Sequence, residues 1–190
     1  MEKIIKLKKF FKSYNLDGYI VPKNNNFFGE YIPTSEDNLK YISNFTGSAG
    51  FAVILKNRNY MFVDGRYTIQ AGIQCGKEFQ ICNIPKEYPF TIFKNKNLNL
   101  GFDPKLHTES SINMLFGNSL IKLKPVNKNL IDLLWKREKN SKIKPFYLIK
   151  DQDAGLKVQK KLDELIKIIK FNKTDYSFVT ASENVAWLLN

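Results

Sequence analysis

The stretch FTGSAGFAVILKNRNYMFVDGRY, residues 45–67, decides the fold of this chain. A loop of small residues opens it and leads into the apolar run 51–55. Four polar residues, 56–59, then separate this run from a second apolar run, 60–63. Two β-rich runs around a tight polar turn predict a hairpin, and their continuous apolar character predicts burial on both faces. The sequence therefore places this hairpin at the centre of a sheet.

Helices and strands alternate on both sides of the predicted hairpin. Apolar residues at helical spacing predict helices, whereas short or alternating apolar runs predict strands. The predicted elements are a helix over 3–14, a strand over 19–21, a helix carrying 39–42, the hairpin, a helix over 66–75, strands over 78–84 and 98–102, a helix after 108, a strand over 120–123 and a short helix over 129–135. They predict an α/β fold with a mixed sheet, because the hairpin is antiparallel.

Three single residues carry local predictions. Asp64 is placed to cap the helix over 66–75, since its carboxylate can accept hydrogen bonds from the free N–H groups of the first turn. Gly117 stands where the next helix ends and is predicted to adopt the left-handed conformation. His107 is the only histidine of the chain, and we interpret it as a solvated surface side chain rather than a substrate contact.

A charged segment divides the chain into two parts. The sequence KREKNSKIKP at 136–145 has almost no apolar residues and predicts a linker. The predicted domains are therefore 1–135 and 146–190. In the second part, a strand is predicted over 146–149, followed by an amphipathic helix, and a second strand over 176–181, followed by a helix that Ser182 and Glu183 cap.

The second part restates the beginning of the first. DGYIV at 17–21 matches DYSFV at 175–179, and SEDNLKYISN at 35–44 aligns with SENVAWLLN at 182–190. The order of the elements agrees as well, which favours an internal repeat over chance similarity. The second copy then lacks its own hairpin, and so short a segment cannot close a core of strands and helices.

This reasoning predicts a truncated second domain. Helix residues that a complete domain would cover should be underpacked and form an exposed apolar patch. The side chains expected to show this are Trp187, Leu188 and Leu189.

Composition restricts the function less than the motifs do. Thirty basic residues against eighteen acidic ones give a formal net charge of +12, but the lysines are scattered along the chain. Nucleic-acid binders more often concentrate Lys and Arg on one face, so we do not favour nucleic acid as a partner. No apolar run is long enough to cross a bilayer, and a cytoplasmic location is expected. Cys75 and Cys82 match no common zinc spacing.

Several motifs together resemble one known family. EYIPTSEDNLKYISNFTGSAGFAVI at 30–54, FVDGRYTIQA at 62–71 and LGFDP at 100–104 look like the N-terminal domain of Xaa-Pro aminopeptidases, of the creatinase/prolidase-type family. NLIDLLW at 129–135 is similar to the segment that closes this domain. TASENVAWLLN at 180–190 resembles the start of a second domain. In combination and in this order, the motifs are specific.

The resemblance implies a fold and an activity. The fold is the creatinase N-terminal-like (ribonuclease H-like) mixed sheet with flanking helices, followed here by an incomplete second copy. Long members of the family have two such domains and then a catalytic domain of pita-bread fold, which removes an N-terminal residue preceding proline with a two-metal centre, usually manganese. The metal ligands lie in that catalytic domain. The resemblance therefore assigns no catalytic residue, metal ligand or cofactor to this chain, which we expect to be inactive alone.

The residues of two of these motifs have structural interpretations. A loop with Gly47, Ser48 and Gly50 invites comparison with phosphate-binding loops, but it leads from a helix into a strand and lacks the Gly-Lys-Ser/Thr ending. Tight backbone packing is the better interpretation. For the second motif, Asp64, Gly65 and Arg66, we expect helix capping and a local ion pair rather than a ligand site.

One surface candidate comes only from the resemblance. In family members the N-terminal domain can border the active site of a neighbouring subunit, so Phe27, Phe28 and Tyr31 are a candidate interface or substrate edge. Three hypotheses for function remain. The favoured one is a non-catalytic N-terminal region of an Xaa-Pro aminopeptidase-like protein, truncated or encoded by a split gene. The second is an interaction module that pairs with itself or with a separately encoded catalytic half, and the third is a nucleic-acid binder.

Overall fold

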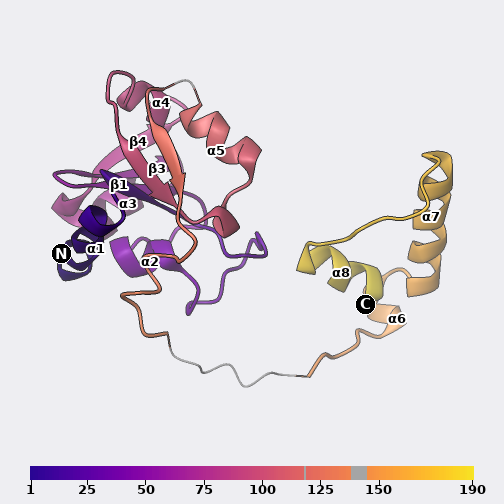
Figure 1. Cartoon of the computed structure of the whole chain (residues 1–190). Helices are drawn as coiled ribbons and strands as arrows, with labels where there is room; N and C mark the ends of the chain where they lie inside the picture. Colours follow the sequence, from indigo (N-terminus) through magenta and orange to yellow (C-terminus); the bar gives the residue numbers. More distant parts are fainter. Residues whose placement is uncertain (118, 138–144) are drawn as a thin grey trace. The chain divides into compact units, whose positions relative to one another are not determined.

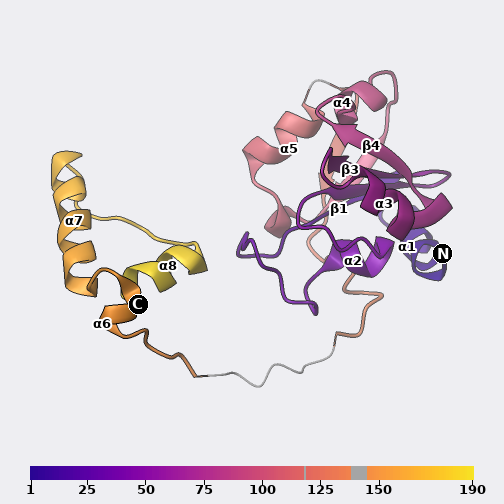
Figure 2. The same cartoon turned by 180° about the vertical axis from the view of Figure 1, so that it is seen from behind.

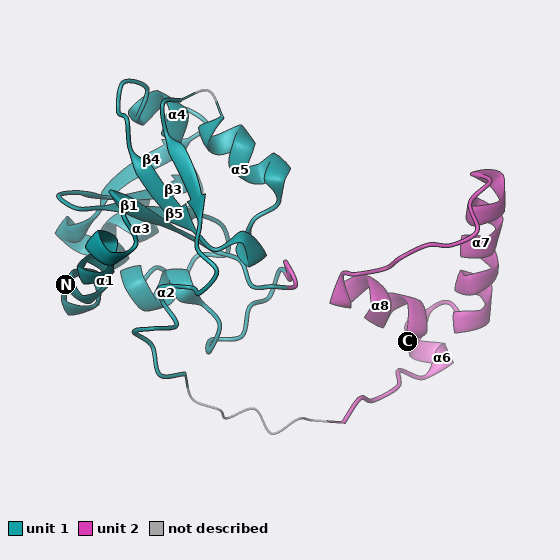
Figure 3. Ribbon diagram, in the orientation of Figure 1, with its two compact units in different colours: residues 1–26, 30–138 teal, residues 27–29, 139–190 magenta. Residues whose placement is uncertain are grey.

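The computed structural model describes residues 1–117, 119–137 and 145–190. It divides into two compact units, the first made of residues 1–26 and 30–138 and the second of residues 27–29 and 139–190 (Figure 3). The predicted linker at 136–145 lies largely outside the described residues.

The first unit is built on one six-stranded sheet (Figure 1). Its strands are β1 (Gly18–Pro22), β2 (Phe51–Leu55), β3 (Asn59–Asp64), β4 (Gln80–Ile84), β5 (Asn99–Phe102) and β6 (Lys122–Pro125), in the order β4-β3-β2-β1-β5-β6. β2 pairs antiparallel with both β1 and β3, whereas the remaining neighbours pair in parallel. The predicted α/β fold with a mixed sheet is confirmed, and β2 and β3 form the predicted hairpin.

Helices cover both faces of this sheet (Figures 1 and 2). They are α1 (Glu2–Ser13), α2 (Asn38–Ser43), α3 (Thr68–Cys75), α4 (Pro89–Ile92) and α5 (Glu109–Phe116), with short 3-10 helices at Gly76–Glu78 and Pro104–Leu106. Buried side chains of α1, α2 and α3 belong to one apolar cluster, and those of α5 belong to another on the opposite face. β2 contributes to both, since Ala52 and Ile54 lie in the first cluster and Val53 in the second. This double burial explains why the run 51–55 is apolar without interruption.

The loop before β2 approaches neighbouring groups closely. Gly50 has φ +145°, and a Cβ atom placed there would lie 2.9 Å from the carbonyl oxygen of Phe62. A Cβ on Gly47 would lie 2.2 Å from the ring of Phe45. Both positions therefore need glycine, the first for its conformation as well as for space.

Two predictions about helix ends are wrong. α3 begins at Thr68, and its N-cap is Tyr67 with no side-chain cap bond. Asp64 instead accepts from the backbone N–H and the guanidinium of Arg66, so its carboxylate is used before the helix starts. Gly117 is the C-cap of α5, as expected, but its φ of −60° lies in the right-handed region instead of the left-handed one, and its N–H donates to the carbonyl of Asn113.

The segment 129–135 folds as turns rather than the predicted short helix. The side chain of Asn129 accepts from the N–H of Ile131 at 2.9 Å, and such a local side-chain bond competes with helix formation. Leu130 and Ile131 are fully buried, so the segment does pack onto the first unit. The ring of Trp135 stacks on that of Tyr41, with centroids 4.5 Å apart.

The second unit contains helices but, within its described residues, no strand. Its helices are α6 (Asp151–Ala154), α7 (Val158–Phe171) and α8 (Ser182–Leu189). The strands predicted at 146–149 and 176–181 do not form. A strand needs a neighbour for its backbone N–H and C=O groups, and the described part of this unit offers no sheet to these segments.

The expected apolar patch is present on the second unit in part. Trp187 is 62% exposed and Leu189 51% exposed, whereas Leu188 is half-buried. The ammonium of Lys161 donates to the carbonyl oxygen of Trp187 and to the side chain of Asn190. A lysine therefore occupies the most buried position of α7.

The close approach of Gly50 gives a testable expectation. Gly50→Ala forces a side chain into a left-handed backbone next to the Phe62 carbonyl, so we expect the free energy of unfolding to fall by about 2 kcal/mol or more. Urea denaturation of both variants and the wild type measures this. The matched control is Gly72→Ala inside α3, where nothing lies within 4 Å, and it should be neutral or stabilise by about 0.5–1 kcal/mol. Equal effects of the two changes would contradict the close approach.

Candidate functional site

The two glycine-containing motifs meet at one end of the hairpin. The hydroxyls of Ser48 and Tyr67 are 2.8 Å apart, and the edge of the Tyr67 ring packs against Phe45 with centroids 5.8 Å apart. The hydrogen bond from Ser48 lowers the pKa of the Tyr67 phenol. Sequence reasoning treated the loop 46–50 and the motif 64–67 separately, because it could not pair Ser48 with Tyr67.

Asp64 and Arg66 form a local, two-pronged ion pair. The guanidinium nitrogens donate to the two carboxylate oxygens at 3.0 and 2.8 Å, and these bonds lower the pKa of Asp64. The side chain of Arg66 is 72% exposed, and its charged group lies 5.2 Å from the Tyr67 ring centroid. Gly65 has open space around its Cα. The group as a whole is solvated, and exposed pairs of this kind add little to stability because water screens them.

A small cavity lies beside the loop that contains Ser48 and Gly50. Its volume is about 240 Å³. It is lined by Pro22, Lys23, Asn24, Ser48, Ala49, Gly50, Phe51, His107, Ser111 and Leu115. These residues come from the end of β1 and the positions after it, and from the loop before β2 with the first residue of β2. The others come from the segment between β5 and α5, and from α5.

The interpretation of His107 as a solvated side chain is wrong. Its Nε2 atom is buried without a hydrogen-bond partner among the described residues, and its ring packs edge-on against Phe102 at 5.7 Å. Burial lowers the pKa of the imidazole to about 4, so it is neutral at physiological pH. The 3-10 turn Pro104–Leu106 places the ring against the strand. The Asp-Pro pair that starts this turn was visible in the sequence, but the direction of the ring was not.

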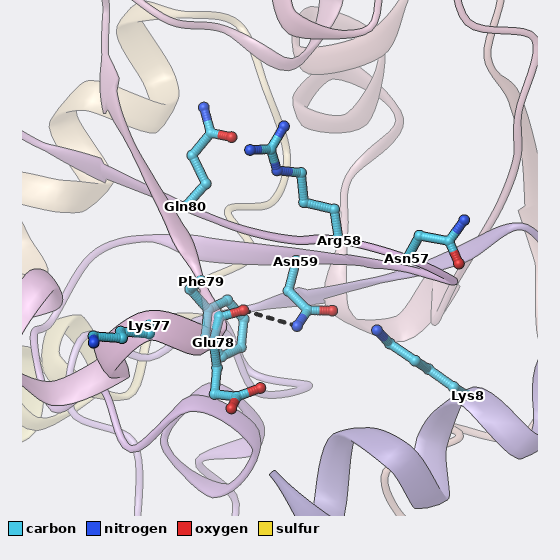
Figure 4. Close-up of a pocket in the computed structure, with 8 residues that line it drawn as sticks. All are labelled: Lys8, Asn57, Arg58, Asn59, Lys77, Glu78, Phe79 and Gln80. Atoms are coloured by element: carbon cyan, nitrogen blue, oxygen red, sulfur yellow. Dashed lines mark hydrogen bonds between the residues drawn. The ribbon is translucent and has the colours of Figure 1, made fainter.

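A second hollow lies beside the hairpin turn (Figure 4). Its volume is about 430 Å³, and α1 contributes Lys8 to its lining. The side-chain amide nitrogen of Asn59 donates to the carbonyl of Glu78 at 2.9 Å, while its Oδ1 is buried without a donor among the described residues. In Figure 4 the guanidinium of Arg58 points away from Lys8. The cations of this hollow therefore do not converge on one ligand position.

The surface candidates lie on the loop between β1 and α2. Phe27 is 74% exposed, Phe28 45% and Tyr31 83%. Phe28 has φ +53°, an uncommon conformation for a bulky residue. The geometry is that of exposed aromatic side chains on a loop, and it assigns no partner to them.

The described residues offer neither a metal centre nor a membrane-spanning helix. Within residues 1–117, 119–137 and 145–190, no group of three or more His, Cys, Asp or Glu side chains lies close enough together to hold a metal ion. None of the helices in these ranges is long and apolar enough to span a membrane.

Comparison with known proteins identifies the family. The sequence model of the Creatinase/Prolidase N-terminal domain matches residues 3–131, which is more than half of the chain. The chain belongs to this family. The fold expected from the resemblance, a creatinase N-terminal-like mixed sheet with flanking helices, is therefore confirmed.

Relatives with a named activity match almost the whole chain. A probable Xaa-Pro aminopeptidase P of Coprinopsis cinerea is 30% identical over 97% of this chain and 31% of its own length. One of Laccaria bicolor is 29% identical over 100% of this chain and 31% of its own. This chain thus spans about 30% of the length of these relatives. The crystal structure of the X-prolyl aminopeptidase of Caenorhabditis elegans, described as a cytosolic enzyme with a di-nuclear active site, is 25% identical, with a TM-score of 0.82 over 98% of this chain and 34% of that one.

A shorter solved structure shares the fold of the first unit. The N-terminal domain of the cytoplasmic peptidase PepQ of Mycobacterium tuberculosis matches with a TM-score of 0.56 and 19% identity. The match covers 70% of this chain and 98% of that domain.

The burial of His107 predicts a pH dependence of stability. The folded pKa of about 4 lies below the ordinary 6.5, so the unfolded state binds the proton more readily. The free energy of unfolding therefore has its full value above about pH 6.5. It falls by about 3 kcal/mol, on account of His107, as the pH falls to 4. Urea midpoints measured from pH 7 to pH 4 should fall more steeply for the wild type than for His107→Phe. A titration of the single histidine by NMR that gives a pKa near 6.5 would contradict the burial.

Proposed function

We propose that this chain is the non-catalytic N-terminal region of an Xaa-Pro aminopeptidase P-like metallopeptidase. One observation carries the proposal. The similarity to these enzymes extends over essentially the whole chain and stops at about a third of their length. It therefore includes residues of the second unit, beyond the family domain matched at 3–131.

The activity of the whole protein is proposed from its relatives. It is the release of an N-terminal residue that precedes proline, with a divalent metal, manganese or another, in a catalytic domain outside this sequence. The di-nuclear active site named for the Caenorhabditis elegans enzyme supports a metal pair there. The same comparison supports a cytosolic location.

Within such a protein, the loop between β1 and α2 has a structural role at the active-site boundary. Phe27, Phe28 and Tyr31 are exposed on one loop and are suited to contact a second subunit of a homo-oligomer. In this role they form an interface or substrate edge and do not take part in the chemistry. The motif of Gly47, Ser48 and Gly50 with Asp64, Gly65 and Arg66 shapes the end of the hairpin.

A second candidate function is an interaction module that pairs with a separately encoded catalytic half. The observation in its favour is the exposed apolar surface of the second unit. Side chains that contribute to it are Ile166, Ile168, Phe171, Trp187 and Leu189. Apolar patches of this kind mark association surfaces in soluble proteins.

The proposed function predicts that the chain alone is inactive. We expect no turnover of an Xaa-Pro peptide with this purified chain in manganese, because the proposal places the metal ligands in the catalytic domain. Release of the N-terminal residue is measured, with the full-length Caenorhabditis elegans enzyme as the positive control. Manganese-dependent turnover that follows this protein through purification would refute the proposal.

The module hypothesis predicts a complex. The chain should co-elute in size-exclusion chromatography with a separately expressed catalytic domain of a relative, through the exposed face of α8. Trp187→Ser should weaken this co-elution, whereas Ile69→Ser on α3 of the first unit removes a similarly exposed apolar side chain and should leave it intact. Separate elution of the two wild-type proteins counts against the module and leaves the first candidate unaffected.

A further inference from the structure

The hollow beside the hairpin turn is lined by cations that lack a partner. They are Lys8 on α1, Arg58 in the turn between β2 and β3, and Lys77 in the 3-10 helix after α3. None of these three side chains has an ion pair or a hydrogen bond with a residue that the structure describes. Glu78 is the one acidic residue in the described lining, which therefore carries a net charge of +2.

The elements around this hollow are held in fixed positions. The N–H of Leu55 donates to the carbonyl of Arg58 at 2.9 Å and closes the hairpin turn. The side-chain amide of Asn59 donates to the carbonyl of Glu78 at 2.9 Å and ties β3 to the 3-10 helix. Buried side chains of α1 belong to the first apolar cluster, so this helix is anchored as well. A hollow of about 430 Å³ is therefore formed before any partner arrives.

The ammonium of Lys8 is in a position where a bound anion would be stabilising. Figure 4 shows this side chain extended from α1 toward Asn59. Burial lowers the pKa of Lys8, because the charged form loses water without gaining a partner. The charge of Glu78 offsets this effect only in part. A carboxylate beside Lys8 would supply the missing compensation.

The directions of the three cations exclude a single small anion as their common ligand. In Figure 4 the guanidinium of Arg58 points away from Lys8, and the ammonium of Lys77 points away from both. A small anion can contact one of them at a time. A chain that carries several anionic groups can contact them in turn.

The uncharged part of the lining favours a peptide over a nucleic acid. The carboxamides of Asn57 and Gln80 each offer N–H donors and an acceptor oxygen, which match the C=O and N–H groups of a peptide backbone. Proteins that bind single-stranded nucleic acids usually add aromatic rings on which the bases stack. Phe79 is the one aromatic residue in the described lining, and at 6% exposed it offers no ring face for stacking.

We propose that this hollow binds an extended acidic segment of a partner protein. Carboxylates of that segment pair with Lys8, Arg58 and Lys77, and its peptide groups meet the carboxamides of Asn57 and Gln80. Charge complementarity carries the assignment, because a +2 lining on a chain of net charge +12 attracts an acidic partner and repels a basic one. The surface is separate from the proposed peptidase chemistry, and its test needs no activity.

A fluorescently labelled peptide of six glutamates tests the proposal. Its anisotropy is followed while the full chain is added at pH 7 and an ionic strength of about 0.1 M. We expect saturable binding of this peptide and none of its six-glutamine counterpart. Absence of saturable binding overturns the proposal. Tighter binding of a labelled six-nucleotide uridine RNA overturns the assignment of a peptide partner.

Matched variants locate the binding. Lys8→Met and Arg58→Met should each weaken it about fivefold, because one charge-assisted contact is lost. Neither side chain loses a partner among the described residues, so the circular dichroism spectrum should stay unchanged. Lys122→Met is the control, since it removes the same charge from β6, at the opposite edge of the sheet from β4, and should leave binding unchanged. An equal effect of Lys122→Met refutes the site, because net charge alone would then drive the binding.

Discussion

The fold of the first unit depends on the burial of β2 on both of its faces. This strand is antiparallel to both neighbours, so it joins the parallel pair of β3 and β4 to the parallel set of β1, β5 and β6. Its side chains enter both apolar clusters. A polar residue at any position from 51 to 55 would lose its contact with water without a partner, which is unfavourable by a few kcal/mol. The close approach of Gly50 to β3 fixes where this strand begins.

Most of the first unit could be predicted from the sequence because its signals are local. The hairpin, α1 and β1 follow from apolar periodicity and from turn residues, and the structure has all three. The errors lie where a competing local hydrogen bond decides. Asp64 bonds to Arg66 before α3 starts, and Asn129 bonds to Ile131 where a helix was expected. Residue type alone does not tell which of two nearby N–H groups a carboxylate or an amide will accept from.

The candidate cavity could not be predicted, since it is a product of topology. Lys23, Gly50 and His107 are far apart in sequence and meet because β1 pairs with β2 on one side and with β5 on the other. The pairing of β1 with β5 brings together the ends of two strands separated by three other strands along the chain. His107 had appeared solvated because a loop position next to a capping threonine is usually exposed. Its burial follows from the 3-10 turn before it, whose geometry no periodicity reveals.

The two units show how similar segments fold with and without neighbouring strands. DGYIV at 17–21 provides most of β1 and is buried between two neighbouring strands, whereas the similar DYSFV at 175–179 forms no strand, with Tyr176 and Phe178 about 90% exposed. Both segments carry β-forming residues, so propensity does not separate them. The difference is the presence of partner strands, above all β2, in the first unit. The helices α7 and α8 of the second unit form without partner strands, because a helix satisfies its backbone hydrogen bonds internally. Helices therefore form where strands do not. In the described part of the second unit there is no sheet for these helices to cover, and apolar side chains such as Trp187 stay exposed.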